Sequence, residues 1–221
     1  MIARELISPL IPPLKPTDRG SKVLTWMEEL RVNQLPVIKE SKFIGLITEE
    51  VLLEGNDIDL EVKDYRIIAE NCYVKESQHL FDVLKAATDH GVEVVAVLDD
   101  DDSFEGVITV QDTIRAFAKT SAVQSPGGIL ILSMNQVDYS LTEVARLIES
   151  NDAKILSSSV SSDLQDPAKI KLTIKINMLD MSRIVATLER FGYNIIGKFQ
   201  EPGMINNDRE RFDILLKYLD L

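Results

Sequence analysis

The sequence predicts a mixed chain: an α/β tandem repeat over residues 1–122, followed by an α+β domain of order βαββαβ over residues 127–221. The repeat is visible in Phe43-Ile44-Gly45-Leu46-Ile47-Thr48, which returns as Phe104-Glu105-Gly106-Val107-Ile108-Thr109. A joint containing Ser, Pro and Gly at residues 121–128 precedes a change in the hydrophobic pattern. Self-similarity at a fixed period indicates a duplicated supersecondary unit, so we expect two folded halves in the first domain.

The first copy, at about residues 1–62, predicts a short opening helix, a proline-broken extended segment, a helix, two strands and a second helix. Thr17-Asp18 offers an N-cap for the first long helix, whose apolar residues recur at helical spacing. Leu35–Ile38 and Phe43–Ile47 are separated by polar residues 39–42, which is typical of a hairpin. Thr48 then caps the second helix.

The second copy, at about residues 63–122, repeats this order. It begins at Cys72-Tyr73-Val74, continues through a helix around residues 80–87, and forms strands at 92–98 and 104–109. The acidic run Asp99 to Asp102 is interpreted as a solvated loop, because consecutive carboxylates on a turn point in different directions. We assign it no metal.

The second domain is predicted to contain strands at 129–134, 153–160, 170–176 and 193–199. A helix capped by Ser140 follows the first strand, and another around residues 184–188 precedes the last. This strand-helix-strand-strand-helix-strand order is the split βαβ arrangement. Residues 207–221 add an amphipathic helix with Phe212, Leu215, Leu216 and Leu219 on one face.

Composition limits the function classes. The formal charge is −12, most of it in residues 1–125, and no dense Lys/Arg cluster is present, so nucleic acid is not an expected partner. The single cysteine excludes an intrachain disulfide and a cysteine-rich zinc site. No apolar run of membrane-spanning length or secretory core appears, and the chain is expected to be cytoplasmic and not to associate with membranes.

No catalytic motif appears either. His79 and His90 are the only histidines, and neither lies near a nucleophile or ligand at a suggestive spacing, so structural or surface roles are expected. No glycine-rich loop ends in Lys-Ser/Thr. Three hypotheses remain open: a ligand-sensing regulatory protein, which we favour, a ligand-free dimerisation or docking module, and an unrecognised enzyme. We expect no enzyme and no catalytic cofactor.

The paired units resemble tandem cystathionine-beta-synthase (CBS) domains, through the apolar-Pro-Val-Ile strand, the Phe-x-Gly-apolar-Ile-Thr strand end and the helix that follows. The resemblance implies that the two repeats pack as a pseudo-dimer. It also implies that an adenine nucleotide (AMP, ATP or S-adenosylmethionine) is a regulatory ligand in a cleft between them. The family carries its contacts on a strand-end Thr and an Asp three residues later.

The second repeat has that pair as Thr109 and Asp112, whereas the first has Thr48 followed by Val51. One competent site is therefore expected. The resemblance implies that Asp112 binds ribose, that Thr109 binds phosphate, and that Val94 and the backbone of Cys72, Tyr73 and Val74 frame the base. Arg115, one helical turn beyond Asp112, either neutralises a phosphate or is simply an exposed cation. A helix cap with a first-turn acid is the equal alternative for Thr109 and Asp112.

The C-terminal domain resembles an ACT domain, a small ferredoxin-like module that often binds amino acids and often pairs with its own copies. The turn after its first strand carries Gln136, Asp138 and Tyr139, the candidate amino-acid-binding residues, although the Pro-Gly pair of that family is replaced by Tyr139-Ser140. A turn-forming role for Asp138 is the alternative. The two resemblances together imply a homodimer that relays nucleotide occupancy through the ACT-like domain to an unidentified target protein.

Overall fold

The computed structural model describes residues 1–55 and 57–200, apart from the side chain of residue 121. The chain divides into two compact units, residues 1–117 and 118–221. Each unit contains its own hydrophobic core. The amphipathic segment expected at residues 207–221 lies outside the described residues.

The first repeat forms the elements predicted for it. A 3₁₀ turn at Ala3–Leu6 opens the chain and an extended segment follows. The regular elements are α1 (Gly20–Leu30), β1 (Gln34–Lys39), β2 (Lys42–Thr48) and α2 (Glu49–Glu54). The predicted hairpin is present, and Glu40 and Ser41 at its tip both have positive φ, as the commonest two-residue hairpin turns require.

The second repeat forms the same order, after a 3₁₀ turn at Val62–Asp64. Its elements are β3 (Tyr73–Lys75), α3 (Leu80–His90), β4 (Val94–Leu98), β5 (Phe104–Thr109) and α4 (Val110–Ala118). β3 pairs in parallel with β4, which pairs antiparallel with β5. In the first repeat the residue matching Val74 is Leu14, which forms a parallel bridge to Val37 as Val74 does to Val97.

One predicted cap is wrong. The N-cap of α1 is Arg19, whose side chain does not cap the helix, rather than Thr17 or Asp18. The Asp18 carboxylate instead accepts from the backbone N–H of Lys15 at 2.7 Å, which closes the preceding turn. The N–H of Gly20 is satisfied by the carbonyl of Leu60, so a local side-chain acceptor is not needed there. By contrast, Thr48 caps α2 as expected, accepting from Val51 N–H at 3.2 Å.

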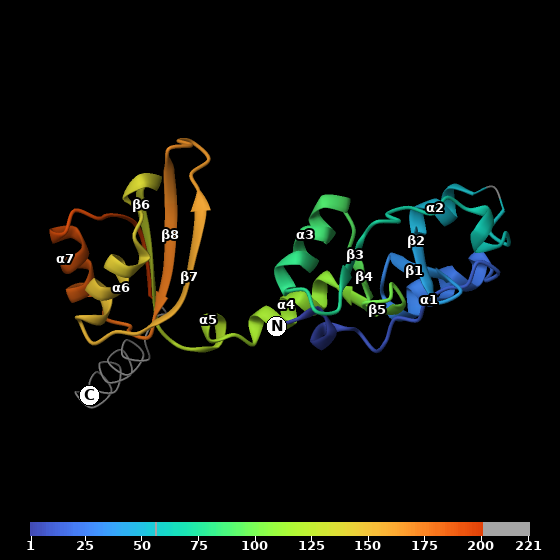
Figure 1. The fold of residues 1–221 in the computed structure, drawn as a ribbon, viewed down its shortest axis with the longest axis horizontal. Coiled ribbons are helices and arrows are strands. Elements are labelled where there is room, and N and C mark those ends of the chain that lie inside the picture. The colour runs from blue at the N-terminus through green and yellow to red at the C-terminus, as the bar shows by residue number, and fades with distance from the viewer. Residues whose placement is uncertain (56, 201–221) are drawn as a thin grey trace, which may run out of the picture. The chain divides into compact units, whose positions relative to one another are not determined.

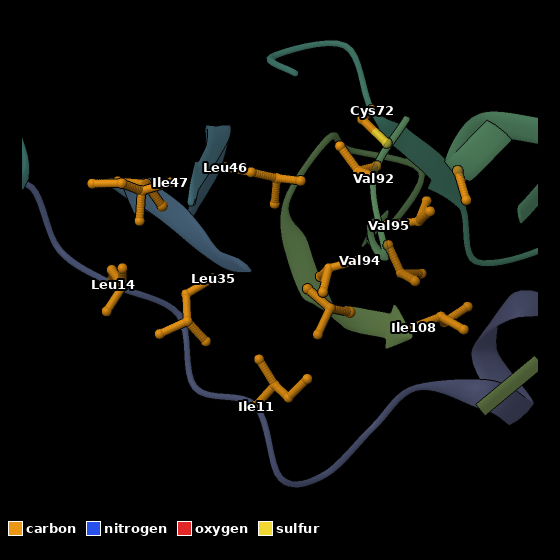
Figure 2. Packing of buried hydrophobic residues seen from close by; sticks show 14 of the residues in the cluster. Ile11, Leu14, Leu35, Leu46, Ile47, Cys72, Val92, Val94, Val95 and Ile108 are labelled. Atoms are coloured by element: carbon orange, nitrogen blue, oxygen red, sulfur yellow. The ribbon is translucent and has the colours of Figure 1, made fainter. Parts of the chain in front are cut away.

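The two repeats share a single core. Figure 2 shows Leu35 and Leu46 of the first repeat in one cluster with Val94 and Ile108 of the second. Packing these side chains together removes from water apolar surface that neither hairpin could cover alone. Each Å² of apolar surface buried in this way stabilises the folded state by about 25 cal/mol. The two repeats therefore pack against each other within the first unit, as the resemblance implies.

The lead-in segments of the repeats are exchanged. Ser8 N–H, ahead of α1 in the first repeat, donates to the carbonyl of Val107 in β5 of the second repeat at 2.8 Å. Ile68, ahead of β3 in the second repeat, exchanges two backbone hydrogen bonds with Leu46 in β2 of the first repeat, at 2.7 and 2.9 Å. Each segment thus extends the hairpin of the other repeat. This exchange brings residues 8–11 beside the second repeat.

The second unit has the predicted order of strands and helices. After a short helix α5 (Ser121–Gln124), its elements are β6 (Gly128–Asn135), α6 (Leu141–Glu149), β7 (Ile155–Ser162), β8 (Lys169–Ile176), α7 (Ser182–Arg190) and β9 (Asn194–Gln200). The antiparallel strands run in the order β7-β8-β6-β9. Figure 1 shows α6 and α7 on one face of this sheet, where their apolar residues pack on Leu130, Leu132 and Leu172.

Candidate functional site

Thr109 and Asp112 bind each other where β5 ends and α4 begins. Thr109 Oγ1 accepts from Asp112 N–H at 3.0 Å, and the Thr109 N–H donates to Asp112 Oδ2 at 3.2 Å. The Thr109 hydroxyl also donates to Oδ2 at 2.6 Å. These reciprocal bonds satisfy two backbone N–H groups at the start of α4, as in a capping box. The sequence spacing thus produces the cap that was weighed as the alternative to a binding site.

Arg115 reaches back to the same carboxylate. Its Nη1 donates to Asp112 Oδ1 at 3.3 Å, one helical turn away. The Asp112 side chain is 21% exposed and the Arg115 side chain 62%, so this ion pair lies at the surface and contributes little to stability. The Asp112 Oδ2 accepts hydrogen bonds from the backbone N–H and the hydroxyl of Thr109, while, among the described residues, Oδ1 accepts only from the Arg115 guanidinium. A carboxylate offers about four acceptor positions, which leaves Oδ1 able to accept further hydrogen bonds.

A cavity of about 670 Å³ opens beside this pair. We call it the inter-repeat cavity, because both repeats line it. The first repeat contributes residues of its lead-in segment and of the C-terminal end of α1: Ser8, Leu10, Ile11, Glu29, Leu30, Arg31 and Val32. The second contributes the start of β4 and the start of α4: Glu93, Val94, Thr109, Val110, Gln111, Asp112, Ile114 and Arg115. Its volume falls in the range of small-molecule sites in proteins.

Several predicted site residues meet here and three do not. Thr109, Asp112, Val94 and Arg115 all line the inter-repeat cavity. Cys72, Tyr73 and Val74 are not among its lining residues. Cys72 is buried in the core near Val92, where Figure 2 labels both, and its thiol lies 3.8 Å from the carbonyl of Ala86. Val74 is a core residue, and Tyr73 is 41% exposed. Ser8, Leu10 and Ile11 of the exchanged lead-in segment line the cavity instead.

Arg31 is the residue that the sequence reasoning missed. It ends α1 in the left-handed conformation, with φ 55°, where the second repeat has Gly91 with φ 64°. A non-glycine residue at such a position is uncommon and costs free energy. Aligning the two copies by Val23-Leu24 and Val83-Leu84 sets Arg31 against Gly91, so this signal was present in the sequence.

The matching position in the first repeat lacks an acid. Thr48 caps α2 through Val51 N–H, and Val51 offers only an apolar side chain where α4 has Asp112. A separate cavity of about 380 Å³ lies beside the second lead-in segment, lined by residues 66–71 and His90. Thr48 and Val51 are not among its lining residues. The two repeats therefore differ in the groups that they present to a ligand.

The second unit contains its own polar cavity, of about 520 Å³. Of the three candidate amino-acid-binding residues, Asp138 lines it, whereas Gln136 and Tyr139 do not. Asp138 accepts from Asn135 Nδ2 at 2.8 Å, and Tyr139 packs against the core of the unit. Lys169 and Asn194 also line the cavity, because the antiparallel register sets them against Asn135 and Ser133. Burial, followed by the Glu143 carboxylate, raises the pKa of Tyr193 in the same wall.

The histidines have structural roles. His79 is the N-cap of α3, and its Nδ1 accepts from Phe81 N–H at 3.2 Å. His90 is the last residue of α3, where Nδ1 lies 3.0 Å from the carbonyl of Ala86. Across residues 1–55 and 57–200, no group of three or more His, Cys, Asp or Glu side chains is arranged to hold a metal. In the same ranges, no helix is long and apolar enough to cross a membrane.

Residues 62–119 match the family model of the CBS domain. The matched segment includes Thr109 and Asp112. Among curated proteins, the inosine-5′-monophosphate dehydrogenase of Methanocaldococcus jannaschii is 24% identical over 148 residues, which are 66% of this chain and 30% of the enzyme. The chain thus spans less than a third of the length of that relative.

Three solved structures are similar over about half of the chain. Protein MJ1004 from Methanocaldococcus jannaschii has a TM-score of 0.50 and 19% identity, over 55% of this chain and 62% of its own. A CBS domain pair/ACT domain protein from Thermotoga maritima has a TM-score of 0.49 and 20% identity, over 54% and 98%. A CBS domain protein from Pyrobaculum aerophilum, complexed with AMP, has a TM-score of 0.44 and 16% identity, over 51% and 89%. A CBS domain is therefore detected in residues 62–119, and the structural neighbours of this chain include CBS domain pair proteins.

Proposed function

We propose that this chain is a regulatory protein that senses an adenine nucleotide (AMP, ATP or S-adenosylmethionine) in the inter-repeat cavity. The observation that carries the proposal is the lining of that cavity, where Thr109, Asp112 and Arg115 of one repeat meet Arg31 and Ser8–Ile11 of the other. A ligand held by both repeats binds one relative arrangement of them better than another. Occupancy then becomes a conformational signal.

Each part of a nucleotide finds a suitable group in this cavity. A ribose hydroxyl would donate to Asp112 Oδ1, the oxygen that Thr109 leaves open. A phosphate would be neutralised by the guanidinium of Arg115 or Arg31, close to the N-terminus of α4. The base would lie against the apolar side chains of Val94, Leu10 and Ile11. The backbone of Cys72–Val74, expected from the resemblance to frame the base, is replaced in this proposal by the exchanged lead-in segment.

We propose one nucleotide site for each chain rather than two. At the matching positions Val51 stands in place of Asp112 and Gly91 in place of Arg31, so the strand-end carboxylate and the helix-end arginine of the inter-repeat cavity have no counterparts there. The cavity beside the second lead-in segment presents Arg66 and Glu70 instead. The exchanged lead-in segments support a CBS-type pairing of both repeats, and the matching parallel bridge within each repeat supports their common origin, although their ligand groups differ.

The second unit would act as the ACT-like output domain. Residues 119–127 join α4 to its first strand, so a change in the second repeat would reach it along the chain itself. An amino acid is a second candidate ligand, with Asp138 meeting its ammonium group in the cavity of that unit. Gln136 and Tyr139 would contribute through the turn that positions Asp138 rather than by direct contact. A homodimer and a separate target protein complete the proposal, with no catalytic step.

The alternative is a ligand-free dimerisation or docking module. One observation favours it: Thr109 and Asp112 satisfy each other and cap α4 without any ligand. In that case the pair stabilises the helix and the cavity remains solvent-filled.

Thermal unfolding of the full chain, measured with AMP, ATP, S-adenosylmethionine and a panel of amino acids, distinguishes the nucleotide sensor from the ligand-free docking module. A ligand at a hundred times its dissociation constant stabilises the folded state by about 2.7 kcal/mol. We expect a shift with at least one adenine compound that Asp112→Ala abolishes. Asp82→Ala is the matched control, because Asp82 accepts from His79 N–H in the capping box of α3 but does not line the cavity.

The outcomes are distinct. No shift with any adenine compound would favour the docking module, and equal loss of binding in Asp82→Ala would show that helix capping alone matters. Chemical conversion of a bound nucleotide would support the enzyme hypothesis. A shift with an amino acid that Asp138→Ala removes would support the second ligand site.

A further inference from the structure

The negative charges that line the inter-repeat cavity outnumber the positive ones. The charged groups are three carboxylates, Glu29, Glu93 and Asp112, and two guanidinium groups, Arg31 and Arg115. Asp112 and Arg115 pair with each other at 3.3 Å. The remaining charges are then two acids and one base, in a chain whose formal charge is already −12.

These remaining groups are free to act on a ligand. Among the described residues, Glu29, Glu93 and Arg31 form no ion pair with a neighbour, and all three are exposed. The backbone of Glu93 is fixed, since its N–H donates to Gln34 Oε1 at 2.9 Å and its carbonyl accepts from Val110 N–H at 2.9 Å. The backbone of Glu93 is therefore held next to β4, beside the start of α4.

From this charge pattern we infer that the cavity selects an adenosine compound bearing no more than one phosphate and discriminates against triphosphates. The inference rests on the proposed function. Arg31, the remaining base, and the N-terminus of α4 supply countercharge for a single phosphate group. Each further phosphate brings more negative charge into a cavity whose other charged groups are Glu29 and Glu93. Like charges within a Debye length repel each other, and because Glu29 and Glu93 are exposed, this repulsion weakens as the salt concentration rises.

The test measures dissociation constants of adenosine, AMP and ATP for the full chain by titration calorimetry. A chelator keeps divalent cations away, so that ATP retains its full charge. We expect AMP to bind at least about tenfold more tightly than ATP, which is a difference of about 1.4 kcal/mol in binding free energy. Adenosine serves as the probe of the nucleoside part alone.

Neutralising the two acids should remove the preference. In the double variant Glu29→Gln/Glu93→Gln, the ratio of the ATP and AMP dissociation constants should fall by about tenfold, while adenosine binding stays unchanged. The double variant Glu28→Gln/Asp100→Asn is the matched control. It removes the same charge, but neither residue lines the cavity, so the ratio should stay as in the parent chain.

The outcomes separate the inference from the function on which it rests. If adenosine, AMP and ATP all fail to bind, both are overturned. If ATP binds as tightly as AMP or more tightly, the nucleotide site stands and the charge selection is wrong. If the control double variant changes the ratio as much as the cavity variant, the selection comes from the overall charge and the assignment to Glu29 and Glu93 is overturned.

Discussion

Ile7 occupies the space that a side chain at Gly106 would need: a Cβ on Gly106 would lie 2.5 Å from Ile7 Cγ2. The first repeat contains the same relationship in reverse, since a Cβ on Gly45 would lie 2.4 Å from Ile67 Cγ2 and 2.7 Å from the carbonyl oxygen of Ile68. Both glycines have φ in the region that other residues rarely adopt, at 154° and 137°. These two glycines therefore make room for the exchanged lead-in segments.

Gly106→Ala and Gly45→Ala are each expected to lower the free energy of unfolding by about 2–4 kcal/mol, because they combine backbone strain with a steric clash. Urea denaturation of the full chain measures the change. Gly91→Ala is the control, since its φ of 64° is also unfavourable for alanine but no atom lies within 4 Å of the added Cβ. It should cost only about 1 kcal/mol. Equal losses in all three variants would contradict the packing argument.

The two strand-end threonines should differ in function but not in stability. Thr48→Ala and Thr109→Ala each remove the side-chain acceptor at a helix N-terminus and should destabilise by about 1 kcal/mol. Only Thr109→Ala should also weaken binding of an adenine nucleotide, because only Thr109 lines the inter-repeat cavity. Calorimetric titration of both variants checks this. Weaker binding in Thr48→Ala alone would place the ligand elsewhere.

Cys72 should contribute a pH dependence at high pH. Burial raises the pKa of its thiol to about 11, from a reference value of 9.0. Since the folded-state pKa is raised, the stabilisation is present below pH 9 and is lost as the pH rises through about 11. Above the folded-state pKa, the free energy of unfolding should be about 2–3 kcal/mol lower than below pH 9. Denaturation curves between pH 8 and 11, compared with those of Cys72→Ala, isolate this contribution from that of the tyrosines.

A thiol reagent gives an independent check on Cys72. The thiolate is the reactive form, so the folded chain should react slowly at neutral pH and quickly once it is unfolded in denaturant. Fast labelling of the folded chain, or identical pH profiles for Cys72→Ala and the parent, would contradict the burial argument.

Self-association is expected from large apolar side chains on the surface of the first unit. Phe81 at the start of α3 is 65% exposed and Leu53 in α2 is 63% exposed. The chain has a mass of 24.8 kDa, and light scattering should report about twice that value for a dimer. The double variant Leu53→Asp/Phe81→Asp should be monomeric, because burying two carboxylates in an interface is costly. Leu164→Asp, at a residue 97% exposed in the second unit, is the control.

A parent chain that is monomeric at all concentrations would contradict the expected homodimer. A double variant that remains dimeric would move the interface away from Leu53 and Phe81, for example to a sheet edge of the second unit.

Local patterns were enough to predict the elements. The alternation and turn residues around Phe43–Thr48 and Phe104–Thr109 gave both hairpins, and Thr48 and Ser140 were correctly identified as caps. The spacing of Thr109 and Asp112 correctly put them on one face of a helix start. These features depend on residues within a few positions of one another, which is the range over which a sequence pattern is informative.

Contacts between distant segments were harder to predict. Nothing near Ile7 or Ser8 in the sequence reveals that they pack on Gly106 and Val107, so the wall of the inter-repeat cavity was assigned to Cys72–Val74 instead. The cap of α1 was missed for the same reason, because Gly20 finds its acceptor on Leu60. Arg31 was accessible in principle through its mismatch with Gly91, but only after the two copies had been aligned.

The exchanged lead-in segments have a consequence for how this chain can be divided. A cut between the two repeats would separate neither half cleanly, since residues 7 and 8 would stay with one fragment while their hydrogen-bonding strand β5 stayed with the other. Each fragment would then expose a strand edge without its hydrogen-bond partner, together with the backbone of the glycine, Gly45 or Gly106, on which the exchanged segment packs. We expect such fragments to pair with each other through these edges when mixed, and each fragment alone to be prone to aggregation.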